Sequence, residues 1–221
     1  MRSNRPVRRA ETRVNEPLGD LRFRSLISDA DWSALPHSIR RRFSRRVTDG
    51  NTVVYVGEIL ETRMSVAGWL LAQVMRLVGS PFPICRHAHV PSVVSVTEDW
   101  EVGGQIWTLL YARRGHFPQI VHSSKRFAGP TGLEEHVRCG VGVTLTLDVV
   151  DEALVFRGQD YFVDWLGVRI WLPAWMTPGD LSATHAECAD DRFSFTLDVI
   201  HPRFGLLIRQ MALFRGARPN S

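Results

Sequence analysis

Cysteine is scarce in this chain of 221 residues, which contains three. Cys85, Cys139 and Cys188 are far apart in the sequence, and their number is odd. A secreted domain held together by disulfide bonds would carry an even set of cysteines at short, regular spacings. We therefore expect these residues to be reduced thiols that serve as small, mostly apolar side chains.

Long apolar runs are missing as well. The longest one, residues 69–78, is interrupted by Gln73 and Arg76 and is too short to cross a bilayer. The N-terminus is basic but has no apolar stretch of the kind that a signal peptide needs. By elimination, we expect a cytoplasmic protein without a transmembrane segment.

The common nucleotide and nucleophile motifs are also absent. The Gly140-Val141-Gly142 stretch lacks the third glycine and the following helix of a dinucleotide-binding turn. No phosphate-binding loop and no Gly-x-Ser-x-Gly nucleophile elbow occurs. No cofactor is expected from these patterns, and whether the protein is an enzyme stays open.

Positive charge exceeds negative charge, with 27 Lys and Arg against 23 Asp and Glu. The excess is concentrated in residues 1–13, which hold five arginines and one acid, and in a second group at Arg40, Arg41, Arg42, Arg45 and Arg46. Such groups can neutralise phosphates, but no zinc finger, aromatic RNA-binding motif or recognition helix accompanies them. We therefore do not expect the chain to bind nucleic acid.

The chain divides into a short tail and one long folded part. Residues 1–19 combine arginine, proline and asparagine without a hydrophobic period, which predicts a disordered basic tail. With 44% hydrophobic and 23% charged residues, the chain has the composition of a globular protein, and no linker interrupts it. We expect a single barrel-like domain over residues 20–216.

Apolar residues alternate with a period of two through most of the chain after residue 88. Residues 141–149 are the clearest case, with valine and leucine at every second position and threonine or aspartate between several of them. This pattern is typical of a strand with one wet face. Gly, Pro and Asp turn signals separate similar runs, which predicts about 9–11 strands in one large curved antiparallel sheet or barrel. The expected fold class is mainly β (α+β).

Helical patterns are restricted to the first part of the chain. Helix-start residues at Ser28 or Asp29, and then Pro36, predict short N-terminal helical turns. Residues 66–78 predict one longer helix, in which only Gln73 and Arg76 are polar, so that we expect it to be buried against the face or mouth of the sheet.

A tight hairpin is also expected before this longer helix. Within residues 43–61, two strand-like runs flank Asp49-Gly50, the residue pair that best supplies the positive φ angles of a two-residue turn.

The strand expected over residues 118–127 carries the most conspicuous polar row. His122, Ser124 and Arg126 share one of its faces, since side chains alternate along a strand. The other face carries Val121, Ser123, Lys125 and Phe127. An imidazole, a hydroxyl and a guanidinium in a row can bind a carboxylate or phosphate, with His122 placed to move a proton. The plainer interpretation is a solvated strand face.

Two other clusters contain side chains that are suited to metal or acid–base chemistry. Cys85, His87 and His89 are zinc-competent side chains, but no second ligand group follows at zinc-finger spacing, so no metal site is expected. Glu134 and Glu135 are adjacent and would point to opposite faces of a strand, which argues against one catalytic pair.

Several stretches, taken in their order, resemble the bacterial family known as domain of unknown function 4166. They are residues 35–43 (LPHSIRRRF), 57–63, 67–83, 103–111, 123–135 (SSKRFAGPTGLEE), 171–179 and 192–210. The resemblance covers about residues 30–215. It implies no activity, cofactor or catalytic residue, because none is established for the family. Some members follow a nicotinamide-dependent oxidoreductase domain, which implies a setting in small-molecule or lipid metabolism.

The leading hypothesis is a barrel that binds a small hydrophobic or amphipathic, lipid-like molecule. Such a site requires an enclosed cavity of at least ~300 Å³. The candidate ligand-binding residues are His122, Ser124 and Arg126, helped by Glu58, Trp107 and Tyr111.

Two alternatives remain. The first is an enzyme on the same scaffold, with His122 or His185 as general base and Arg126 or Lys125 stabilising an oxyanion. The second is a non-catalytic module that docks a partner, such as a separately encoded oxidoreductase, through strand edges or the arginine groups.

Overall fold

The computed structural model describes residues 19–48, 50–77, 82, 87–113 and 115–217. Apart from Gly19, the expected disordered tail lies outside these residues. The division of the chain into a tail of residues 1–19 and a single domain of residues 20–216 stays a prediction. The elements, in chain order, are η1 (Arg24–Leu26), α1 (Asp29–Ala34), α2 (His37–Phe43), β1 (Val53–Met64), α3 (Val66–Leu77), β2 (Val90–Asp99), β3 (Gly104–Tyr111), β4 (Gln119–Arg126), β5 (Glu134–His136), η2 (Arg138–Gly140), β6 (Val141–Val150), β7 (Ala153–Trp165), β8 (Val168–Trp171), η3 (Ala174–Met176), β9 (Asp180–Cys188), β10 (Arg192–His201) and β11 (Gly205–Gly216).

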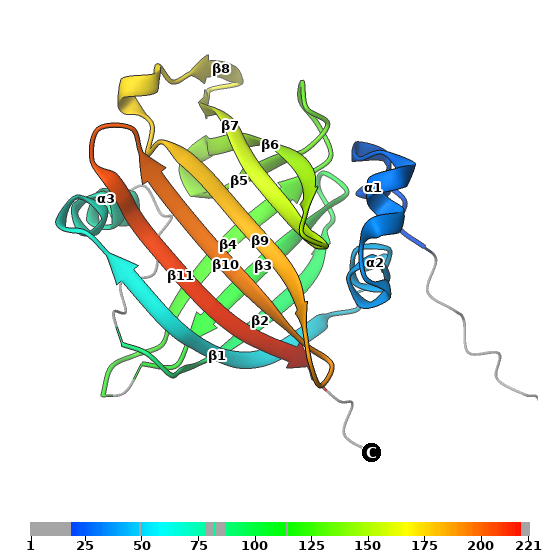
Figure 1. Ribbon diagram of the computed structural model, residues 1–221. Helices are drawn as coiled ribbons and strands as arrows, with labels where there is room; N and C mark the ends of the chain where they lie inside the picture. Colours follow the sequence, from blue (N-terminus) through cyan, green and yellow to red (C-terminus); the bar gives the residue numbers. More distant parts are fainter. Residues whose placement is uncertain (1–18, 49, 78–81, 83–86, 114, 218–221) are drawn as a thin grey trace, which may run out of the picture.

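The strands form one antiparallel barrel (Figure 1). Their order is β6-β5-β4-β3-β2-β1-β11-β10-β9-β7-β8, and an additional pairing of β6 with β7 closes ten strands, while β8 extends the sheet beside β7. The mainly β fold and the expected number of strands are therefore confirmed. Side chains just fill the interior of an eight-stranded barrel, so ten strands leave room inside.

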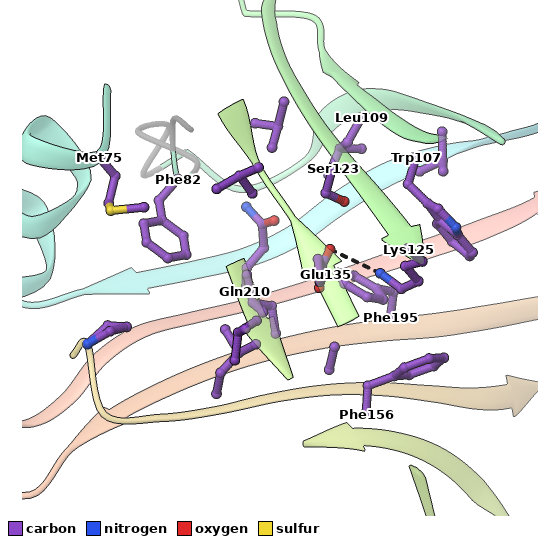
Figure 2. Close-up of a pocket in the computed structure, with 18 of the residues that line it drawn as sticks. Met75, Phe82, Trp107, Leu109, Ser123, Lys125, Glu135, Phe156, Phe195 and Gln210 are labelled. Carbon is purple, nitrogen blue, oxygen red and sulfur yellow. Dashed lines mark hydrogen bonds and ion pairs between the residues drawn. The ribbon is translucent and has the colours of Figure 1, made fainter. Parts of the chain in front are cut away.

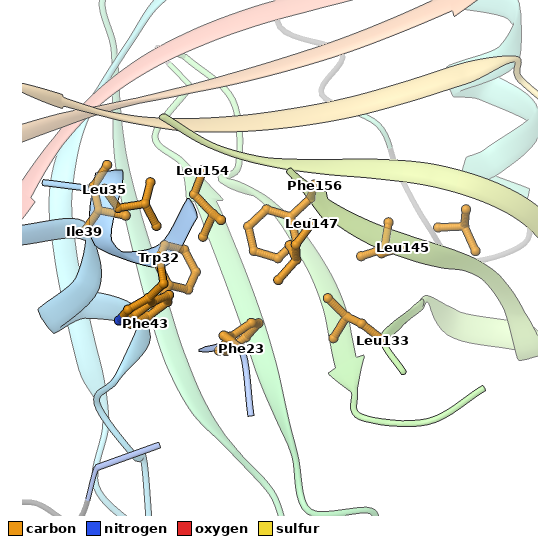
Figure 3. Packing of buried hydrophobic residues seen from close by; sticks show 11 residues of the cluster. Phe23, Trp32, Leu35, Ile39, Phe43, Leu133, Leu145, Leu147, Leu154 and Phe156 are labelled. Carbon is orange, nitrogen blue, oxygen red and sulfur yellow. The ribbon is translucent and has the colours of Figure 1, made fainter. Parts of the chain in front are cut away.

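The N-terminal helices close one end of the barrel. Ser28 Oγ caps α1 by accepting a hydrogen bond from the Asp31 amide at 3.1 Å, and Pro36 precedes α2, as expected. The apolar faces of these helices pack among side chains of β6 and β7 (Figure 3). This buried cluster contains Trp32, Leu35, Ile39 and Phe43 from the helical segment and Leu145, Leu147, Leu154 and Phe156 from the strands. Each such side chain contributes roughly 1.5–3 kcal/mol on burial.

Helix α3 lies at the other end of the barrel and packs on β11 and β1 (Figure 1). The helix itself is confirmed, but its expected burial is wrong: Gly68 and Ala72 are buried, while four apolar residues are more than half exposed. These are Val66, Leu70, Val74 and Leu77. The reason is that α3 rests on the rim through one narrow face, where a Cβ on Gly68 would lie 2.0 Å from the Leu207 carbonyl oxygen.

The hairpin expected around Asp49-Gly50 is also wrong. Gly50 has a positive φ of 73°, but a strand forms only after it, as β1, and Asp49 lies outside the described residues. Helix α2 continues to Phe43, whose ring is buried in the core, so too few residues remain before the turn for a pairing strand. Arg45 makes only an isolated bridge with Gly19.

None of the helices in the described part of the chain has both the length and the apolar character needed to cross a membrane.

Candidate ligand-binding cavity

A cavity of about 330 Å³ occupies the barrel between α3 and the end that α2 closes (Figure 2). Its volume is at the lower end of the range for small-molecule sites, about 300–1,000 Å³. Most of its lining is apolar and aromatic. Leu71, Met75 and Phe82 border it toward α3, and Trp107, Phe156 and Phe193 border it toward α2.

The inner faces of β3 and β4 form one wall of this cavity. Trp107 on β3 pairs with Ser123 on β4, and Leu109 pairs with Val121, and all four residues line the cavity. Lys125 continues the same face of β4. The wall therefore combines apolar side chains with a hydroxyl and an ammonium group.

The face of β4 that was expected to point inward is the opposite one. His122 is exposed, with its Nδ1 2.9 Å from Oγ1 of Thr108. Ser124 donates a hydrogen bond to Asp99, and Arg126 Nε lies 4.0 Å from the same carboxylate. None of these three predicted residues lines the cavity. Side chains alternate along a strand, so the predicted row and the row that lines the cavity are offset by one residue.

The other three predicted residues are divided between the inside and the outside. Trp107 and Tyr111 line the cavity, and the Tyr111 hydroxyl donates to Oε1 of the buried Gln210 at 2.9 Å. Glu58 does not line it, and its Oε2 lies 3.2 Å from Nδ1 of the exposed His89. Two of the six predicted residues thus border the cavity.

An ion pair lies inside the barrel, between residues that were not predicted as ligand contacts (Figure 2). Lys125 Nζ is 3.0 Å from Glu135 Oε1, with side chains 10% and 22% exposed. Burial acts to raise the pKa of Glu135, but the Lys125 charge and a hydrogen bond from Ser123 more than offset it, so the pKa is lowered. The carboxylate of Glu135 is therefore charged at neutral pH.

His185 on β9 is a deeply buried polar group of the cavity lining, at 3% exposed. Its ring lies among aromatic side chains, and its Nδ1 has no hydrogen-bond partner among the described residues. These neighbours are Phe43, Trp107, Phe156, Phe193 and Phe195. Burial, with a smaller effect from the Arg42 and Lys125 charges, holds the pKa of His185 well below its usual value of 6.5. The imidazole is neutral at pH 7.

Arg42 reaches the same end of the cavity from α2. Its guanidinium carbon lies 3.7 Å from the centre of the Phe193 ring, and its buried Nη1 has no hydrogen-bond partner among the described residues. Burial lowers the pKa of Arg42, and the Tyr55 hydroxyl and the Glu187 charge oppose this shift.

One sequence feature identifies the inner face of β4. The row with Ser123 and Lys125 has an apolar residue at each end, Val121 and Phe127, whereas the row with His122 has one apolar residue in β4, Ile120, which is 44% exposed. Apolar residues at both ends of a mixed row indicate the buried face, so this signal was present in the sequence.

A second charged cluster lies on the opposite face of β5 and outside the cavity. Glu134 is 1% exposed, and its carboxylate accepts hydrogen bonds from Arg169 on β8 and lies 2.8 Å from Nε2 of His136. Arg169 also donates to Asp164 at 2.9 Å. This network ties β8 to β5, and, as expected, Glu134 and Glu135 do not form one pair.

Potential metal ligands do not gather anywhere in the described ranges: no three His, Cys, Asp or Glu side chains come together there. Cys85, the first residue of the zinc-competent stretch, lies outside these ranges.

Comparison with known proteins places the chain in a family. The family model described as "Domain of unknown function (DUF4166)" matches residues 35–214. The chain belongs to this family. No curated protein matches this DUF4166 chain. A crystal structure described as "a putative thioesterase II from Thermobifida fusca YX" is 9% identical, covers 76% of this chain and 79% of its own, and has a TM-score of 0.23. This likeness is too low to carry an argument about activity.

Proposed function

We propose that this DUF4166 barrel binds a small hydrophobic or amphipathic molecule inside its cavity. The observation that carries the proposal is the cavity of about 330 Å³ with a mainly apolar lining. Burial of apolar surface contributes about 25 cal/mol per Å², so a ligand that loses about 300 Å² of exposed surface gains roughly 7 kcal/mol before the costs of ordering.

The polar groups of the cavity support a ligand with one polar end. Ser123, Lys125, Glu135 and His185 present hydroxyl, ammonium, carboxylate and imidazole groups in an otherwise apolar space. A few polar groups placed in an apolar lining are typical of sites that orient a small molecule. These residues, together with Trp107, replace the outer row of β4 as the proposed anchors.

The position of the cavity also supports exchange of a ligand with solvent. Val74 of α3 and Met176 of η3 both line the cavity, and both are more than half exposed. We place the opening between these two elements.

Binding is better supported than general-base catalysis. A base such as His185 would need a partner to orient its ring, and its Nδ1 has no hydrogen-bond partner in the described part of the chain. The His136–Glu134 pair has the required geometry, but neither residue lines the cavity. A cytoplasmic location and an oxidoreductase partner stay predictions.

A fluorescence titration with the neutral apolar probe N-phenylnaphthylamine tests this function. Leu109→Trp adds a large side chain to the cavity wall, and Leu110→Trp makes the same change at the next residue of β3, which does not line the cavity. We expect saturable binding to wild type and to Leu110→Trp, and at least about 10-fold weaker binding to Leu109→Trp. Equal binding to both variants would refute the proposed location, and no saturable binding to the wild type would refute the function.

A further inference from the structure

The charges inside the cavity are unbalanced. Among the described lining residues, Arg42 and Lys125 are cations, and Glu135 is the one carboxylate. Lys125 is paired with Glu135 at 3.0 Å, whereas Arg42 forms no ion pair with a carboxylate among the described residues. Arg42 donates a hydrogen bond to the Tyr55 hydroxyl, so one positive charge in the lining lacks a carboxylate partner there.

The cationic and imidazole groups lie around the same aromatic rings. Lys125 Nζ is 5.1 Å from the Trp107 ring centre, and the His185 ring centre is 6.0 Å from it. The Arg42 guanidinium lies over Phe193, and His185 stacks on that ring at 6.2 Å. The three nitrogen-bearing groups thus gather at the α2 end of the cavity.

Two of these groups each carry one buried nitrogen that has no hydrogen-bond partner among the described residues. His185 Nδ1 and Arg42 Nη1 are buried, and neither makes a hydrogen bond to a described residue. Leaving a buried donor unpaired is costly, and an acceptor that enters the cavity would remove this cost. The other charges that act on Arg42 come from Glu187 and Asp191, and burial nevertheless lowers its pKa.

The opposite end of the cavity is apolar. Toward α3 and η3, it is bordered by Leu71, Met75, Phe82, Leu172 and Met176. We propose that the ligand is an amphipath with a single anionic headgroup, held at the α2 end by Arg42 and His185, and an apolar tail that extends toward α3. This inference rests on the proposed function, because it names the class of molecule that the cavity takes.

Three probes with the same chain test the role of charge, measured by calorimetry on ligand-free wild-type protein. They are dodecanoate, dodecanol and dodecyltrimethylammonium. A charge-assisted hydrogen bond predicts that dodecanoate binds about 10- to 100-fold more tightly than dodecanol and that the cation binds most weakly. If dodecanol binds as tightly as dodecanoate, the inference is wrong and the proposed function stands. If none of the probes binds, both are wrong.

A matched pair of variants on α2 tests the headgroup contact. Arg42→Met removes the cavity cation that has no carboxylate partner in the lining, whereas Arg41→Met removes an exposed neighbour that does not line the cavity. We expect Arg42→Met to weaken dodecanoate binding by about 10- to 100-fold, with dodecanol affinity unchanged, and Arg41→Met to alter neither. Arg42→Lys should restore part of the preference for dodecanoate. Equal effects of Arg42→Met and Arg41→Met on dodecanoate binding would overturn the assignment of Arg42 to the headgroup. If Arg42→Met does not fold, the comparison of the three probes with wild-type protein decides alone.

Discussion

Replacing Lys125 by methionine should destabilise the barrel far more than its loss of one charge suggests. The methionine has a similar length, so it leaves little empty space. The cost arises instead from Glu135, whose carboxylate lies 3.0 Å from Lys125 Nζ and would be left in an apolar cavity without the cation that stabilises its charge.

The magnitude follows from the burial of both partners. Their side chains are 10% and 22% exposed, and removing one partner of a buried ion pair costs about 3–5 kcal/mol. Glu135 keeps a hydrogen bond from Ser123, so we expect the lower end of this range, about 3 kcal/mol. For a chain of this size, such a loss lowers Tm by about 6–12 °C.

Chemical and thermal unfolding of ligand-free protein measure this effect, with two further variants for comparison. Arg157→Met breaks a pair with Asp148 in which both side chains are 46% exposed, so it should cost less than about 1 kcal/mol. The double variant Lys125→Met/Glu135→Met removes both buried charges and should be more stable than Lys125→Met. A loss in Lys125→Met no larger than that in Arg157→Met, or a double variant that is the least stable, would refute the reasoning.

Three further predictions concern other parts of the fold. Gly68→Ala should displace α3, because the new Cβ would lie 2.0 Å from the backbone carbonyl oxygen of Leu207. Since α3 borders the proposed opening, N-phenylnaphthylamine should be released faster in a stopped-flow experiment, and an unchanged release rate would contradict this prediction. His185→Leu should reduce the acid sensitivity of the protein, because burial lowers the pKa of His185 and only the unfolded chain takes up its proton below about pH 6.5. Urea unfolding at several pH values should show the wild type losing up to about 1.4 kcal/mol more than the variant per pH unit between about pH 6.5 and 5, and parallel profiles would disprove it. Glu134→Gln should cost about 3 kcal/mol in thermal unfolding, because the buried carboxylate receives two hydrogen bonds from Arg169, and a cost below about 1 kcal/mol argues against that network.

The fold was predictable where one face of a strand is uniformly apolar. In β6, Val143, Leu145 and Leu147 alternate with more polar residues, and all three are buried. Burial of one face specifies both the presence of the strand and its orientation, because a slip of one residue would expose that face.

The site was only partly predictable because both faces of β4 are polar. The period of two separates His122, Ser124 and Arg126 from Ser123 and Lys125, but the period alone does not tell which row faces inward, and only the flanking Val121 and Phe127 favour the row of Lys125. The partner of Lys125 comes from β5, a strand of three residues for which no periodicity can be measured. Trp107, which was among the predicted residues, does line the cavity, as large aromatic residues on an alternating strand often pack inside.

Helix α3 shows a different limit of sequence reasoning. A helix that is apolar on most sides is normally buried, and for α3 this expectation fails because Gly68 and Ala72 provide a narrow contact with the rim. Some of its other apolar residues, including Leu71 and Met75, face the cavity rather than a solid core. A ring of strands around a cavity leaves no continuous surface for the helix to cover, and a periodicity argument does not detect this.

A crystal structure of the protein grown with N-phenylnaphthylamine tests the central claim most directly. The account predicts electron density for the probe inside the barrel, between Leu109 and Phe195, with α3 over one end of the cavity. Probe bound only on the outer surface, or an interior filled by the protein's own side chains, would contradict it.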